Sequence, residues 1–108
     1  MYDKVMPLNR KAKGPIMVTA IILMNVERKE INNVAEQLAG MDEISEAYSV
    51  SGNHDLVAMV RVPTNDELSD LVTKKLAVIP AILRTETLLA FRAYSRHDLE
   101  AMFDIGLD

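Results

Sequence analysis

The stretch VSGNHDLVAMVRV, residues 50–62, decides the fold. From His54 to Val62 its apolar side chains occupy both alternating faces of an extended chain. A strand that is apolar on both faces belongs in the middle of a covered sheet. The residues before it, from Ser51 to Asp55, are of the types that form tight turns between strands. The stretch therefore predicts a hairpin that leads into a central strand.

Three further strands are predicted around this one. Residues 17–26, MVTAIILMNV, are again apolar on both faces and predict a second central strand. Residues 43–51 and 82–94 carry more polar side chains, which is typical of strands at the edges of a sheet. In residues 43–51, regular alternation predicts one face that is shared by Ile44, Glu46, Tyr48 and Val50. In residues 82–94, it predicts one face that is shared by Arg84, Glu86 and Arg92.

Two helical patterns connect these strands. In the first, apolar residues recur with helical spacing, and Gly40 stands where a helix C-cap is expected. The stripe of this helix consists of Ile31, Val34, Ala35 and Leu38. Thr64 and Glu67 form a capping-box pattern that opens the second helix, which ends before Pro80. A short third helix is expected between Ser95 and Gly106.

The predicted order, β-α-β-β-α-β with a C-terminal tail helix, is that of an α+β, ferredoxin-like fold. Two strand-helix-strand units interleave into a four-stranded antiparallel sheet with both helices on one face. The first and third strands are then central, which agrees with their apolar character. The other face of these strands still requires burial, and a second copy of the sheet is a natural cover. We therefore expect a dimer through facing sheets; the alternative is a monomer whose tail helix crosses that face.

Composition and charge exclude several classes of protein. The 108 residues predict one domain, and the chain contains no cysteine, which fits a reducing cytoplasm. No apolar run reaches the length of a membrane span. Residues 1–16 carry a net charge of +3 and predict either a flexible basic leader or a non-native remnant. The domain predicted over residues 17–108 carries −7, and such an acidic surface is poorly suited to binding nucleic acid.

The sequence predicts no catalytic residue, metal site or cofactor. The two histidines, His54 and His97, are not in a metal-ligand spacing. No serine lies in a nucleophile elbow, and no glycine-rich phosphate loop is present in the sequence. We therefore expect a protein that is not an enzyme.

The turn at residues 51–55 has the chemistry of a binding site. Gly52 and Asn53 both tolerate positive φ, and Asp55 begins a mostly apolar strand. Backbone N–H groups together with a carboxylate suit the α-carboxylate and α-ammonium of an amino acid. The alternative, which the pattern alone favours, is an ordinary hairpin turn with a solvated Asp55.

These features resemble the effector domain of the Lrp/AsnC family of transcription regulators. The resemblance rests on VSGNHDLVAMVRV, the capped helix, Pro80 and ILRTETLLAF, and it covers about residues 17–94. It implies a ferredoxin-like fold, a dimer with facing sheets, and a ring of such dimers. It also implies a small effector, often an amino acid, that is held between dimers near the glycine hairpin. The matching ligand-binding positions are Gly52, Asn53, His54, Asp55, Thr85 and Thr87.

The sequence departs from the family pattern in two places. Family regulators carry an N-terminal helix-turn-helix, and residues 1–16 are too few for a three-helix DNA-binding unit. The family often has Pro-Gly before the last strand, where this chain has Pro80 and Ala81. We therefore expect the effector half alone, with no direct DNA binding.

The expected function is that of a stand-alone sensor of an amino acid or small metabolite. It would act through oligomerisation and protein partners, which include full-length family regulators. One alternative is a small dimeric ferredoxin-like enzyme of the cofactor-free monooxygenase type. Another is an assembly domain without a ligand.

Overall fold

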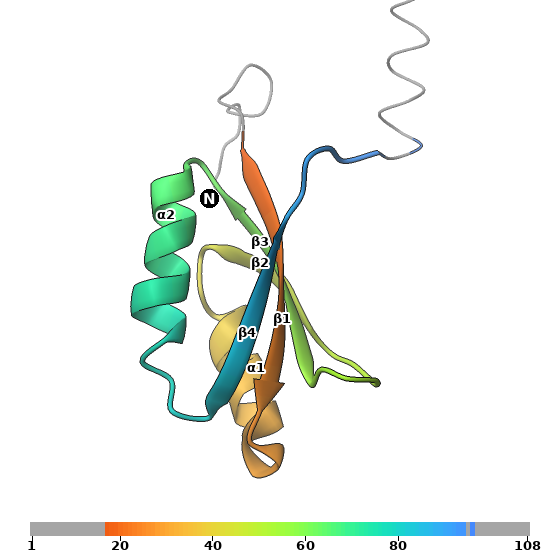
Figure 1. Cartoon of the computed structure of the whole chain (residues 1–108), viewed down its shortest axis with the longest axis vertical. Helices are drawn as coiled ribbons and strands as arrows, with labels where there is room; N and C mark the ends of the chain where they lie inside the picture. The colour runs from red at the N-terminus through yellow and green to blue at the C-terminus, as the bar shows by residue number, and fades with distance from the viewer. Residues whose placement is uncertain (1–16, 95, 97–108) are drawn as a thin grey trace, which may run out of the picture.

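The computed structural model describes residues 17–94 and residue 96 of the chain (Figure 1). The elements in order are β1 (Val18–Val26), η3 (Arg28–Glu30), α1 (Ile31–Ala39), β2 (Ile44–Ser49), β3 (Leu56–Val62), α2 (Asn65–Asp70), η4 (Leu71–Leu76) and β4 (Ile82–Leu89). Here η3 is a short 3-10 turn that leads into α1, and η4 is a π-helical segment that continues α2. The leader expected at residues 1–16 and the tail helix expected at residues 95–106 lie outside the described residues.

The four strands form one antiparallel sheet in the order β2-β3-β1-β4. The expected central positions of β1 and β3 and the expected edge positions of β2 and β4 are therefore confirmed. Figure 1 shows α1 and α2 on the same side of the sheet, as in the ferredoxin-like split arrangement. Within the described residues, no helix is long and apolar enough to cross a membrane.

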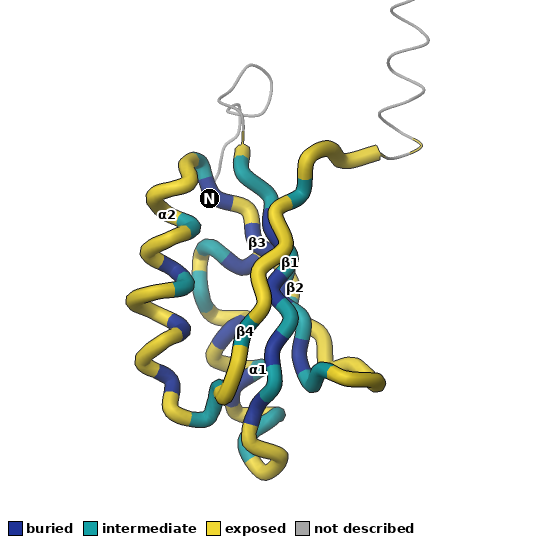
Figure 2. Tube along the Cα trace, in the orientation of Figure 1, coloured by how far each residue is buried: buried dark blue, intermediate teal, exposed yellow. Residues whose placement is uncertain are grey.

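The core lies between this side of the sheet and the helices. Alternate residues of the two central strands are buried there, while the residues between them are mostly half-buried (Figure 2). The buried strand residues are Ala20, Ile22, Met24, Val26, Leu56, Ala58, Val60 and Val62. Val34 and Leu38 of α1 join this cluster, so the predicted stripe of the first helix is confirmed. The core thus uses only one face of the sheet.

The helix ends follow the predicted caps. The Oγ1 atom of Thr64 accepts a hydrogen bond from the Glu67 N–H at 3.1 Å and begins α2. The N–H of Gly40 donates to carbonyls of the last turn of α1. The π-helical continuation of α2 was not predicted. Leu71 and Leu76 are both buried although they lie five residues apart, which is the spacing of a π turn.

The structure corrects the predicted faces of β2. The pairing of β2 with β3 shifts between Ile44 and Glu46, where a β-bulge adds one residue to β2. Ile44 pairs with Val60 and is buried under the helices, whereas Tyr48 pairs with Val57 on the opposite face. The prediction that Ile44 shares a face with Glu46 and Tyr48 was therefore wrong. The bulge lets one edge strand contribute to both faces.

The predicted length of the last strand was also wrong. β4 ends at Leu89 rather than at Tyr94, and Arg92 lies outside it. The N–H of Ala90 makes the last bond of the ladder, to the Thr19 carbonyl at 2.9 Å. Within the described residues β4 pairs with β1 alone, and Val18, the first residue of β1, lies opposite residue 91 in this register, so residues 92–94 have no residue of β1 to pair with.

An ion pair connects the turn before β2 to η4. The Nζ atom of Lys75 donates a hydrogen bond to the Oε2 atom of Glu43. The backbone carbonyl of Glu43 also accepts from the Arg61 N–H of β3 at 3.1 Å. The bond from Lys75 holds the pKa of Glu43 below its ordinary value, although burial acts in the opposite direction. The same bond raises the pKa of Lys75.

This pair makes the stability of the fold depend on pH. Folding lowers the pKa of Glu43, so this residue stabilises the fold at pH values above its ordinary pKa of 4.5. This stabilisation is lost as the pH falls through the lowered pKa of the folded state. The contribution of Lys75 is present below 10.5 and is lost as the pH rises through its raised value. We expect Glu43→Gln to lower the Tm at pH 7 and the difference from wild type to shrink well below pH 4.5, as measured by circular dichroism.

The matched control for this experiment is Asp70→Asn. It breaks the exposed pair between Lys74 and Asp70, whose side chains are 73% and 58% exposed. Exposed pairs contribute little to stability, so the Tm should change little at either pH. An undiminished Tm difference for Glu43→Gln at low pH would show that Glu43 does not act through its charge.

Candidate functional site

The hairpin between β2 and β3 projects from the end of the sheet, on the side away from α2 (Figure 1). Its tip, residues 51–53, is exposed. Gly52 has a φ of 103°, a conformation that favours glycine. A Cβ atom added at Gly52 would meet no atom within 4 Å, so the requirement for glycine comes from the backbone alone. Among the described residues, the N–H groups of Gly52 and Asn53 donate no backbone hydrogen bond.

Asp55 anchors the base of the hairpin to two other strands. Its N–H donates to the Met24 carbonyl of β1 at 2.8 Å, and its carbonyl accepts from the Val50 N–H at 3.1 Å. Its Oδ2 atom accepts from the Val26 N–H at 2.9 Å, in a partly buried position. Asp55 therefore joins the end of β1, the end of β2 and the start of β3. A carboxylate at the start of a mostly apolar strand needs a hydrogen-bond partner, and for Asp55 this partner is the backbone N–H of Val26.

Asn25 is a hairpin contact that the sequence analysis missed. Its Nδ2 atom donates to the Asn53 carbonyl at 2.8 Å and holds the hairpin tip against β1. The available signal was an amide side chain within the otherwise largely apolar stretch at residues 17–26. With Asp55, Asn25 fixes the hairpin to the strand that runs through the centre of the sheet.

His54 lies between the exposed tip and the anchor. It is half-buried, and its Nδ1 atom is buried with no hydrogen-bond partner among the described residues. Buried polar atoms are usually paired, so this nitrogen is a candidate contact for a bound group. In the part of the chain that the structure describes, no cluster of His, Asp and Glu is arranged to hold a metal ion.

Thr85 and Thr87 lie apart from the hairpin. They pair with Met24 and Ile22 of β1, so both threonines are on the face that the helices cover. Thr85 lines a hollow of about 190 Å³ between η4 and β4, together with Val72, Leu76, Ala77, Ile82, Leu83 and Arg84. One chain therefore brings residues 52–55 together but does not bring the two threonines to them.

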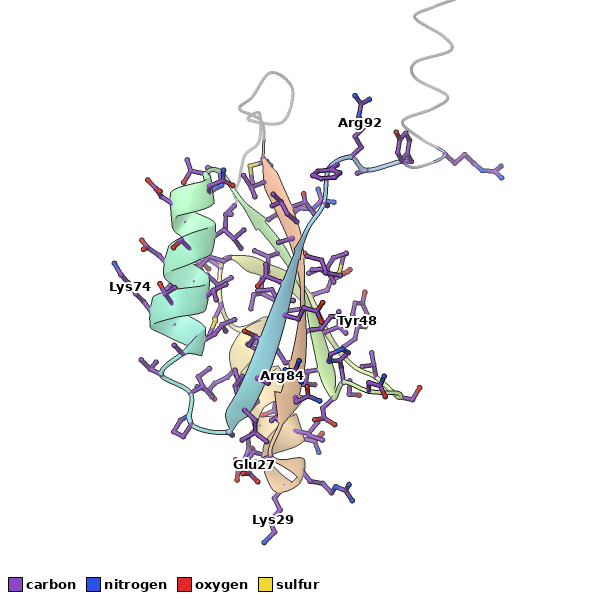
Figure 3. The ribbon with its side chains drawn as sticks, viewed as in Figure 1. Glu27, Lys29, Tyr48, Lys74, Arg84 and Arg92 are labelled. Atoms are coloured by element: carbon purple, nitrogen blue, oxygen red, sulfur yellow. The ribbon has the colours of Figure 1, made fainter. Side chains whose placement is uncertain are left out.

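The face of the sheet away from the helices is apolar at its centre. Its central side chains, Ile21, Leu23, Val57 and Met59, are all half-buried within one chain. Tyr48 of β2 borders this face and is 49% exposed; Figure 3 shows it on the side away from α2. The Tyr48 hydroxyl donates to Glu46 at 2.7 Å, and this bond raises the pKa of the hydroxyl. We call this surface the open face.

Sequence comparison identifies the family. The family described as the Lrp/AsnC ligand binding domain matches residues 19–99, which include all of the four strands but Val18, the first residue of β1, together with the hairpin and both threonines. The chain belongs to the Lrp/AsnC ligand-binding domain family. The resemblance of the hairpin and the last strand to this family is therefore confirmed.

Relatives of this Lrp/AsnC chain support the assignment. An uncharacterised HTH-type transcriptional regulator of Pyrococcus furiosus is 34% identical over 75 residues, which are 69% of this chain and 51% of that protein. The chain thus spans about half the length of this curated relative.

Two solved structures share the fold. The structure of TTHA0845 from Thermus thermophilus is 42% identical, has a TM-score of 0.69, and is matched over 73% of this chain and 99% of its own. The transcriptional regulator NMB0573 of Neisseria meningitidis, solved as an L-Met complex, has a TM-score of 0.71 at 11% identity, over 89% of this chain and 63% of its own.

The anchoring bonds of Asp55 generate a stability prediction. Asp55→Ala leaves the partly buried Val26 N–H without its acceptor, which should lower the free energy of unfolding by about 1–3 kcal/mol. Asp55→Asn keeps an oxygen that can accept from Val26 and should retain most of the stability. Urea unfolding of both variants measures the difference. Equal stability of Asp55→Ala and wild type would show that this bond contributes nothing to the fold.

Proposed function

We propose that this Lrp/AsnC-family domain senses a small effector, an amino acid, at the β2–β3 hairpin and couples its binding to oligomerisation. The observation that carries the proposal is the match of residues 19–99 to the ligand-binding domain of the family. The L-Met complex of the structurally similar regulator NMB0573 supports the choice of an amino acid. Regulation would then act through protein partners, which include full-length family regulators, rather than through direct contact with DNA.

The hairpin offers complementary groups for such a ligand. The N–H groups of Gly52 and Asn53 are donors for an α-carboxylate. Asp55 uses Oδ2 for Val26 and supplies the negative charge for an α-ammonium. The buried Nδ1 atom of His54 is a further group that a ligand could pair after a small shift.

The remaining wall of the site would come from another chain. Thr85 and Thr87 lie on the helix-covered face of β4, so we assign them to the site only as residues of a neighbouring dimer. The effector would therefore bind where two dimers meet, and its binding would favour a ring of dimers. The projection of the hairpin beyond the sheet suits a contact of this kind (Figure 1).

Within each dimer, we propose that the open faces pack together. Apolar side chains of β1 and β3 form the centre of this face, and no helix in the described part of the chain covers it. Burial of apolar surface drives association, and a two-fold axis lets the same patch cover itself. The open face is therefore proposed as a self-complementary interface.

The effector prediction uses Asp55→Asn. A thermal-shift screen against the twenty amino acids should find a ligand, since one at 100 times its Kd adds about 2.7 kcal/mol to the free energy of unfolding. Calorimetry should then show that Asp55→Asn weakens binding more than tenfold, because the ammonium loses its counter-charge. The control is Asp66→Asn, an equal change of charge on an exposed residue of α2, which should bind normally.

Two results would contradict the effector proposal at different points. If no amino acid raises the Tm, the proposed ligand class is wrong. If Asp55→Asn binds with wild-type affinity, Asp55 serves the fold alone and the ammonium has another acceptor.

The dimer prediction uses Leu23→Lys. Leu23 lies at the centre of the open face, between Val57 of β3 and Glu86 of β4. Within one chain the new lysine has Glu86 as a neighbour, so the monomer should fold, whereas two charges buried at a packed interface oppose association. Sedimentation should show a monomer at micromolar concentration. Val78→Lys, at a site that is 71% exposed after η4, is the control and should remain dimeric. A dimer with Leu23→Lys would mean that the open face is not the interface.

A further inference from the structure

The outer edge of β4 is exposed along the side of the sheet. Among the strands that the structure describes, β4 is the last of the sheet and has β1 on one side only. Figure 2 shows β4 exposed over most of its length, in contrast to β1 and β3. An edge strand carries a row of unpaired N–H and carbonyl groups, which can pair with another strand. Such pairing requires that the side chains of β4 match those of the added strand.

The ladder between β1 and β4 determines which residues present their backbone outward. The Ala90 N–H donates to the Thr19 carbonyl. Hydrogen-bonded pairs alternate along an antiparallel ladder, so Arg84, Glu86 and Leu88 direct their backbone groups toward β1. Thr85 and Thr87 then direct theirs toward the free edge. The regular part of this edge begins at Arg84, after the register shift opposite Asn25 and Val26.

The sequence of this edge is complementary to itself. Residues 84–86 read Arg-Thr-Glu, with the two charged side chains on the open face and Thr85 on the helix-covered face. A two-fold axis through Thr85 places Arg84 opposite the partner's Glu86, and Glu86 opposite the partner's Arg84. A two-fold axis through residue 83, 84, 86 or 87 would not pair Arg84 with Glu86. An axis through residue 84 would place Arg84 opposite the partner's Arg84, and an axis through residue 86 would place Glu86 opposite the partner's Glu86.

We propose that β4 pairs in antiparallel fashion with β4 of a second copy of this chain, about a two-fold axis through Thr85. In this register Thr85 faces the partner's Thr85 as a hydrogen-bonded pair, because both present their backbone outward. Arg84 and the partner's Glu86 then form a non-hydrogen-bonded pair, in which side chains approach more closely. Charges on an edge strand usually oppose pairing, but here their order makes the pairing specific.

This contact deepens the assembly step of the proposed function, and it rests on that function only for its place in a ring. The open face would form one two-fold contact and the β4 edge another. Two different two-fold contacts on one subunit link dimers into a closed ring or an open chain, according to the angle between their axes. The β4 edge is thus a candidate for the contact that joins one dimer to the next.

Single cysteines give a direct test, because the chain contains none. In Thr85→Cys the two cysteines of a β4 pair face each other, at a Cα separation of about 5.5 Å that permits a disulfide. Thr87→Cys is the matched control on the same strand and face. Its two copies would lie roughly 13 Å apart along the strand, too far for a disulfide. Under mild oxidation we expect a covalent dimer from Thr85→Cys, formed at least tenfold faster than from Thr87→Cys.

Charge reversal in the Thr85→Cys background tests the ion pairs through the same readout. Arg84→Glu or Glu86→Arg places like charges opposite each other at both ends of the contact, and should slow disulfide formation severalfold. The two reversals together restore opposite charges and should return the rate to that of Thr85→Cys. Slow cross-linking of the doubly reversed protein would show that Arg84 and Glu86 do not face each other across this edge.

The remaining outcomes also decide the proposal. Equal cross-linking of Thr85→Cys and Thr87→Cys would indicate random collision and would overturn the register. No cross-linking of folded Thr85→Cys would overturn the edge contact itself. The proposed function is tested separately from the edge contact. If Thr85→Cys does not cross-link but the wild type forms a dimer that Leu23→Lys breaks, the open-face interface and the proposed function stand without the β4 contact. Thr85 lies on the face opposite Leu23, so a dimer through the open face alone cannot produce the expected disulfide.

Discussion

The structure depends on one constraint, which is that two central strands are apolar on both faces while the helices cover only one. Burial under α1, α2 and η4 uses alternate residues of β1 and β3 and fixes the register of the sheet, since a shift by one residue would exchange the faces. The polar character of β2 and β4 follows from their positions at the edges. The open face is what remains, and its apolar centre is the physical reason to expect a second chain there.

Features that depend on local pattern were predictable from the sequence. The two central strands, the first helix with its stripe, the Thr64 cap and the hairpin at Gly52 all follow from residue type and spacing over a few positions. The strand order also followed, because the fully apolar strands had to be central. Local patterns are therefore sufficient to predict the ferredoxin-like fold.

Features that depend on distant partners were not predictable. The bulge in β2 exists because Ile44 reaches the core while Tyr48 stays on the open face, which a regular alternation cannot provide. The end of β4 is set by the first residue of β1, about 70 positions earlier in the chain. At the candidate site, residue types indicated the hairpin, but the bond from Val26 to Asp55 spans 29 residues and gives Asp55 a structural duty that the pattern did not reveal.

The π turn of η4 has a consequence for how the chain tolerates changes of length. It places Leu71 and Leu76 on one side of the helix with one residue more than an α-helical turn would use. Deleting one residue between Leu71 and Leu76 would leave them four apart, which is the spacing of one α-helical turn, so both would stay on the core side of an ordinary α-helix. Inserting a residue would instead rotate Leu76 by about 100° out of the core and turn the connection through Ile79 and Pro80 away from β4. Among homologous sequences, this segment should therefore accept the loss of one residue far more readily than a further insertion.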